Sequence, residues 1–202
     1  PHIPSIDGLR ADRCLTSERL FELERPPSSL AIIGGGPMGV EMAQALQRLG
    51  VQVTVFQRAH TLLPKEEPSL VDRLTAQLEA EGVAVHCTAD VRSLDHHDDG
   101  TATVHAIVGN RGEHVTSTFG GVLIAAGRTP NLDGLGLREL GIVTTERGIE
   151  VDDRSRTTVR TVYAAGDVAG GRLQTNAAGY EAVRAVRDMF FPGKGSLDSA
   201  IP

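Results

Sequence analysis

The chain has 202 residues, 40% of them hydrophobic and 23% charged, as expected of a soluble globular protein with one or two domains. Its formal charge of −6 and the lack of a basic block argue against nucleic acid as the main partner. No apolar run approaches the roughly 20 residues that span a bilayer, so we expect no membrane contact. Two cysteines are too few for a disulfide framework, which favours a cytoplasmic location.

The first half of the sequence predicts a parallel βαβ unit after a lead-in. Residues 1–28 contain four prolines and a short helix from about Thr16 to Leu23. A strand follows at residues 30–33, then a glycine-rich turn, a helix at residues 40–49 that stops at Gly50, and a strand at residues 51–56. A unit of this size forces a parallel strand pair with a right-handed crossover.

The pattern then changes from helical to alternating. A helix is expected at residues 69–81, and short strands at residues 83–85, 91–94, 101–108 and 114–119 form an antiparallel meander. Residues 122–126 are a buried strand, residues 161–165 another, and residues 176–189 a helix ended by Pro192-Gly193. We read the apolar stripe of this last helix, which includes Val183 and Val186, as core packing. The fold class predicted is therefore α/β.

The glycine-rich turn has the spacing Gly34-x-Gly36-x-x-Gly39. A pyrophosphate needs backbone N–H groups, close approach without a Cβ, and the positive end of a helix dipole. Glycine turns are common, and a purely structural turn is the alternative. The strand before the turn and the helix after it favour a dinucleotide site of Rossmann type.

The end of the second strand is expected to select the nucleotide. An NAD site has an acidic residue there that accepts a hydrogen bond from the ribose 2′-hydroxyl. This chain has Gln57 and Arg58 instead. A neutral amide beside a guanidinium suits a 2′-phosphate, so we expect NADP in preference to NAD. The alternative is that Arg58 is only a solvated loop residue.

Four stretches together resemble the pyridine nucleotide-disulfide oxidoreductases, which include lipoamide dehydrogenase, glutathione reductase and mercuric reductase. They are residues 31–41, 62–64, 123–131 and 157–167, in the order and spacing of that family. The resemblance implies a Rossmann-like NAD(P)-binding domain at residues 29–127 and the second segment of an FAD-binding domain at residues 128–202. It also implies that residues 1–28 link the two, and that the intact enzyme is a homodimer.

The resemblance also implies roles for individual residues. Glu41 would lie near the nicotinamide, and Gly127 and Arg128 between the two nucleotide regions. Gly166 and Asp167 would contact the ribityl chain of FAD. The remaining candidate cofactor-binding residues are Pro37 and Met38 in the glycine turn, and Gln174 and Thr175, whose backbone N–H groups would face the flavin.

The resemblance implies hydride transfer from NAD(P)H to flavin and then to a disulfide or another acceptor. The family's first FAD motif, its redox cysteine pair and its His-Glu pair have no counterpart here, so we expect the central portion of such an enzyme, inactive by itself and without catalytic residues. The alternative is a nucleotide-binding module without turnover; a simple Rossmann dehydrogenase is disfavoured because no acid-base group can be named. The run from His96 to Asp99 is expected to be a solvated turn rather than a metal site, and Cys14 and Cys87 to be structural thiols.

Overall fold

The chain forms two compact units that divide after Arg128. The computed structural model describes residues 1–171 and 173–191. The predicted end of the last helix at Pro192-Gly193, and the final residues up to Pro202, lie outside the described residues.

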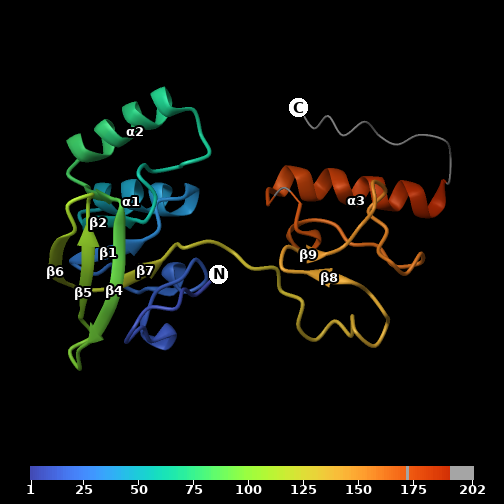
Figure 1. Ribbon diagram of the computed structural model, residues 1–202, viewed down its shortest axis with the longest axis horizontal. Helices are drawn as coiled ribbons and strands as arrows, with labels where there is room; N and C mark the ends of the chain where they lie inside the picture. The colour runs from blue at the N-terminus through green and yellow to red at the C-terminus, as the bar shows by residue number, and fades with distance from the viewer. Residues whose placement is uncertain (172, 192–202) are drawn as a thin grey trace. The chain divides into compact units, whose positions relative to one another are not determined.

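The first unit is built on a four-stranded parallel sheet in the order β3-β2-β1-β7. Figure 1 labels β1, β2 and β7 of this sheet. Strand β1 (Ser29–Ile33) pairs with β2 (Gln52–Gln57), and helix α1 (Pro37–Arg48) connects them, which confirms the predicted βαβ unit. Strand β3 (Ala84–Cys87) extends the sheet beyond β2, and β7 (Val122–Ile124) pairs with the other edge of β1. Gly50 ends α1 with a φ of 90°, as the sequence predicts.

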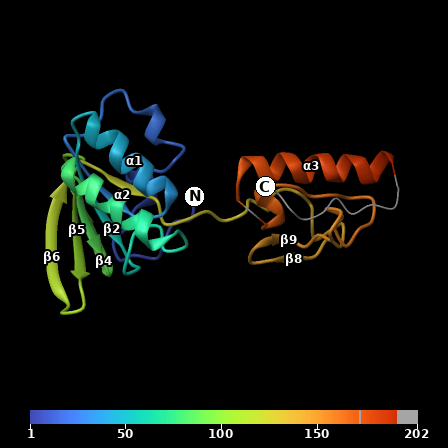
Figure 2. The ribbon, with the colours of Figure 1, turned by 90° about the horizontal axis from the view of Figure 1, so that it is seen from above.

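Alternate residues of this sheet face two different layers, which Figure 2 shows on its two sides. Leu30, Ile32 and Leu123 pack against α1 and against α2 (Pro68–Ala80). Ile33 and Phe56 pack against the antiparallel meander of β4 (Ala89–His96), β5 (Ala102–Val108) and β6 (Glu113–Phe119). The period of two in the strands therefore creates two cores, one on each face of the sheet.

The lead-in, residues 1–28, packs onto the same unit. Asp7 bridges to Ser93 of β4. The backbone N–H of Leu15 donates to Val122 at 2.7 Å, and Leu15 accepts from Ile124 at 2.9 Å. The short helix expected from about Thr16 to Leu23 forms only as the 3₁₀ turn η2 (Leu20–Glu22), and another 3₁₀ turn, η1 (Ala11–Arg13), precedes it. The N–H of Leu20 donates to Thr16 at 2.9 Å in the α-helical pattern, but the N–H of Glu22 then donates to Arg19 at 3.2 Å, so the segment closes as a 3₁₀ turn.

The second unit has a smaller apolar interior. It contains the two-residue strands β8 (Thr144–Thr145) and β9 (Gly148–Ile149), a 3₁₀ turn η3 (Asp167–Ala169) and helix α3 (Thr175–Phe190), with Ile142, Ile149 and Ala164 at the centre of its core. Helix α3 confirms the helix predicted at residues 176–189. The strand expected at residues 161–165 was wrong in this structure. Tyr163 makes a single bridge, to Arg156, because no described strand runs beside this segment.

The expectation for the apolar stripe of α3 was half wrong. Ala177 and Ala185 are buried, but Val183 is 63% exposed and Val186 is 51% exposed. The small residues pack inward, and the larger ones have no covering layer in the described part of the chain. None of the helices described there combines the length and hydropathy needed to cross a bilayer.

Candidate functional site

The glycine turn lies at the carboxyl edge of the parallel sheet, where open α/β sheets place ligands. Gly34 follows β1 directly, and its N–H donates to the carbonyl of Phe56 at 2.9 Å. Its φ is 117°, and a Cβ there would lie 2.4 Å from the carbonyl oxygen of Ala125. No other residue fits at position 34, so the turn is tight for a steric reason.

The next two glycines shape the surface that a phosphate would approach. A Cβ on Gly39 would lie 2.0 Å from the carbonyl oxygen of Gly34, so α1 packs tightly against the turn. Gly36 is the N-cap of α1 in an extended conformation, and a Cβ built on it meets nothing within 4 Å. It therefore faces open space. No side chain caps the start of α1, whose first turn includes Pro37 and Met38 and offers N–H groups without helical acceptors.

The other predicted residues of this unit lie along the same edge. Gln57 ends β2, and its partly exposed amide turns back onto the glycine turn, while Arg58 is exposed. Glu41 is exposed on α1, two residues after Gly39. Gly127, with a φ of 120°, comes three residues after β7, and the exposed Arg128 follows it.

Sequence reasoning missed part of this site. A pocket of about 240 Å³ is lined by Gly34, Gln57, Arg58 and Ala126, but also by residues 89–91 of β4 and by the lead-in. Pairing within the meander and the docking of the lead-in bring these segments to the turn, and no local motif marks them. The pocket contains an acid, Asp90, which is paired with Arg92 at 2.8 Å.

The pair Gly166 and Asp167, for which the family resemblance implies a contact with FAD, lies in the second unit. Gly166 has a φ of 80°, and a Cβ on it would lie 3.1 Å from the Cβ of Ala178 on α3. Its N–H donates to the Glu181 carboxylate at 2.8 Å, a contact that the sequence did not reveal. Asp167 begins η3. Gln174 is the N-cap of α3 and Thr175 its first residue, and no side chain caps this helix start.

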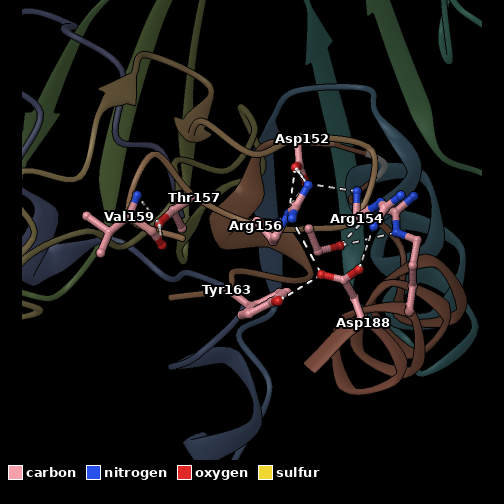
Figure 3. A network of polar contacts seen from close by, with 9 residues as sticks. Asp152, Arg154, Arg156, Thr157, Val159, Tyr163 and Asp188 are labelled. Atoms are coloured by element: carbon pink, nitrogen blue, oxygen red, sulfur yellow. Dashed lines mark hydrogen bonds and ion pairs between the residues drawn. The ribbon is translucent and has the colours of Figure 1, made fainter. Parts of the chain in front are cut away.

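A polar network joins residues 152–163 to the last turn of α3 (Figure 3). Asp188 accepts a hydrogen bond from the Tyr163 hydroxyl at 2.8 Å and one from Arg154 at 3.1 Å, with Arg156 at 3.7 Å. The Tyr163 hydrogen bond and the two guanidinium groups lower the pKa of Asp188, and the same hydrogen bond raises the pKa of Tyr163. The buried Ser155 hydroxyl accepts from Arg184 of α3 at 2.9 Å.

The two cysteines and the run from His96 to Asp99 lie outside the two candidate cofactor sites. Burial raises the pKa of the Cys14 thiol to about 11, and burial also raises that of Cys87. Asp99 accepts from the N–H of Thr101 at 2.9 Å in the turn between β4 and β5. Within residues 1–171 and 173–191, no group of three or more histidine, cysteine or acidic side chains is placed to hold a metal ion.

Comparisons with known proteins agree with this architecture. A family model described as pyridine nucleotide-disulphide oxidoreductase matches residues 1–182. A dihydrolipoyl dehydrogenase of Chlorobaculum tepidum is 35% identical over 90% of this chain and 39% of its own length, and one of Bacillus subtilis is 36% identical over 84% and 36%. The solved HOCl-induced flavoprotein disulfide reductase RclA from Escherichia coli, as a Cu(II) complex, superposes with a TM-score of 0.87 at 31% identity, over 98% of this chain and 44% of its own. The chain thus spans about two fifths of the length of these relatives.

Proposed function

The chain belongs to the pyridine nucleotide-disulphide oxidoreductase family, and from that premise we propose that its first unit binds NADP(H). The observation that carries the proposal is the turn between β1 and α1: Gly34 and Gly39 close it sterically, while Gly36 opens toward solvent at an uncapped helix start. Those are the requirements of a pyrophosphate. Glu41, two residues further along α1, is proposed to lie near the nicotinamide.

We assign the choice between NADP and NAD to the end of β2. Gln57 carries no charge that would repel a 2′-phosphate, and the exposed Arg58 guanidinium offers paired donors to one. The pocket wall formed by residues 89–91 then contacts the adenosine side of the dinucleotide.

We propose that the second unit contributes to an FAD site. Asp167 follows the Gly166 turn and supplies an acceptor, and Gln174 and Thr175 present uncapped N–H groups at the start of α3, where negative charge is stabilised. Arg128 and Gly127 would lie between the two cofactors. When bound, flavin supplies hydride acceptance from the nicotinamide and passes electrons to a disulfide or another acceptor. In the intact protein, which we expect to be a homodimer, this chain would provide the binding surfaces.

Calorimetric titration of the chain with NADPH and NADH tests the first proposal. We expect NADPH to bind more tightly, and the purified chain to be colourless because it spans only about two fifths of the length of its flavoprotein relatives. Weaker binding of NADPH than of NADH would contradict the role of Arg58. A diaphorase assay with added flavin then separates a binding module from a catalytic chain.

Gly36→Val provides a sharp variant for the same titration. The backbone at Gly36 is extended and a Cβ meets nothing, so the fold tolerates the side chain, which projects to where the phosphates would lie. We expect at least about tenfold weaker dinucleotide binding, with the unfolding temperature only slightly lowered because valine is a poorer helix N-cap than glycine. Gly179→Ala is the matched control, because Gly179 on α3 also has open space and lies outside the proposed site. Unchanged binding by Gly36→Val would remove the turn from the site.

A further inference from the structure

Gln57 is bound at both ends of its side-chain amide within the chain itself. Its Oε1 accepts the N–H of Gly35 at 3.2 Å, and its Nε2 donates to the carbonyl of Thr61 at 3.2 Å. The residue at the expected ribose-reading position is therefore engaged with the middle of the glycine turn.

The loop that follows Gln57 also binds Gly35, through the other polar group of its backbone. The N–H of Leu63 donates to the carbonyl of Gly35 at 2.9 Å, so both polar groups of Gly35 are bonded to residues 57–63. A Cβ on Gly35 would lie 2.5 Å from the side chain of Leu62, which is 1% exposed and belongs to the helix-side core. Leu63 has a φ of 43°, a left-handed conformation that is unfavourable for leucine and persists where its surroundings enforce it.

These contacts decide which N–H groups of the turn can face a phosphate. The N–H of Gly35 points to Gln57, and Pro37 has none. The donors that remain are those of Gly36 and the first helical residues, Met38 and Gly39. Their positions depend on the preceding peptide, which the loop holds.

We propose that Gln57 is a positioning residue of the dinucleotide site: it acts through Gly35 on the shared pyrophosphate, and Arg58 alone discriminates the 2′ substituent. The inference rests on the proposed function and sharpens it, because it separates two neighbouring residues into two roles. Position 57 needs an acceptor toward Gly35 and a donor toward Thr61, and an amide supplies both at any pH.

The first test compares affinities for NADP⁺ and NAD⁺ by calorimetry. Gln57→Leu removes both hydrogen bonds at similar volume, and we expect both dinucleotides to bind about three- to tenfold more weakly by the same factor. Arg58→Gln is expected to weaken NADP⁺ alone. Gln52→Leu, at the exposed other end of the same strand, is the control and leaves both affinities unchanged. A changed NADP⁺ to NAD⁺ ratio in Gln57→Leu would overturn the inference.

The second test uses the pH dependence of Gln57→Glu, and it does not depend on how Gln57→Leu folds. A protonated Glu side chain reproduces the amide, with a carbonyl oxygen toward Gly35 and a hydroxyl toward Thr61, whereas the carboxylate sets two acceptors against each other. We therefore expect NAD⁺ binding to this variant to tighten as the pH falls from 8 to 5. Direct recognition of the 2′-hydroxyl by residue 57 predicts the opposite sign, because the carboxylate is the better acceptor.

NAD⁺ binding to the wild-type chain is measured over the same pH range. It gives the pH dependence that comes from the other titratable groups around position 57. These are Arg58 and His60 on the loop, Cys87 at the paired end of β3, and Asp90 and His2 in the adjoining pocket. A wild-type chain that bound neither dinucleotide would overturn the proposed function itself. Normal wild-type binding with the opposite pH trend in Gln57→Glu would overturn only the positioning role.

Discussion

The two units use their helices in opposite ways. In the first, α1 and α2 turn Val40, Ala43, Val71 and Leu78 into the core, each at most 7% exposed. In the second, α3 turns Ala177 inward, while Phe190 is 71% exposed. The first unit thus buries most of the apolar face of its two helices, although Leu70 of α2 is 61% exposed, and much of the apolar surface of α3 remains available for another layer.

The units also differ in the interactions that stabilise them. The core of the second unit is small, and charged side chains connect its loop to α3 through Asp188. Apolar burial is insensitive to pH, whereas ion pairs and hydrogen bonds to charged groups depend on protonation. We therefore expect the first unit to respond most to lost volume and the second to lost charge, and the following predictions test this contrast in order of expected effect.

The largest effect is expected from Leu123→Ala in β7. Leu123 is fully buried in the helix-side core, so its truncation should lower the free energy of unfolding of the first unit by about 2–5 kcal/mol. Val186→Ala on α3 removes a half-exposed side chain and should change stability by less than about 0.5 kcal/mol. Urea unfolding followed by circular dichroism measures both. Equal losses in the two variants would mean that the surface of α3 is covered in solution.

A smaller effect, confined to the second unit, is expected from Asp188→Asn. The amide keeps the shape but weakens the bonds from Tyr163 and Arg154, so α3 should exchange its amide hydrogens faster while the first unit is unchanged. Asp153→Asn makes the same charge change at an exposed position of the same loop and serves as the control. Hydrogen exchange read by mass spectrometry follows the units separately, and unaltered exchange in α3 would show that the network contributes little.

The sequence was sufficient for the elements whose signals are local. Gly34 and Gly36 mark the turn, Gly50 marks the end of α1, and alternation marks the meander. These features depend on backbone conformation and period, which neighbouring residues determine. The predicted cofactor contacts themselves remain predictions.

Features that depend on distant partners were not predictable in the same way. Nothing near Gly166 in the sequence indicates that Glu181 accepts its N–H, and nothing near Gly35 indicates the hold of the 57–63 loop. The stripe on α3 shows the limit most directly: a period of 3.6 establishes that Val183 and Val186 share a face, but not that another layer covers it.

Glu81 is expected to make one small contribution to the pH dependence of the first unit. Glu81 accepts two hydrogen bonds from Arg48, at 2.8 and 2.6 Å, and one from Gln77 at 2.8 Å, and so joins α1 to the end of α2. These bonds lower its pKa to about 2, with that from Arg48 the largest cause. A depressed carboxyl pKa stabilises the fold above the ordinary value of 4.5, and the contribution is lost as the pH falls toward 2.

Glu81→Gln should therefore unfold at a lower temperature than the wild type at pH 7, and the difference should shrink between pH 4.5 and pH 2. Glu79→Gln, exposed on the same helix, is the control. The unfolding temperature measured as a function of pH reports the effect. A difference that stayed constant down to pH 2 would assign the loss to shape rather than to the ion pair.

The smallest expected effect is a difference in alkylation rate between the two cysteine thiols, and this rate reports on the first unit alone. Both cysteines lie in residues 1–128, so alkylation reports only that unit. Cys14 is 1% exposed with a pKa of about 11, so only about one molecule in a thousand carries a thiolate there at pH 8. We expect iodoacetamide to modify the partly exposed Cys87 first, and Cys14 at the rate at which the unit opens. Because Leu123→Ala destabilises this unit, this variant should accelerate the labelling of Cys14. Asp188→Asn should leave the labelling rate unchanged, and acceleration by Asp188→Asn would show that the two units unfold together.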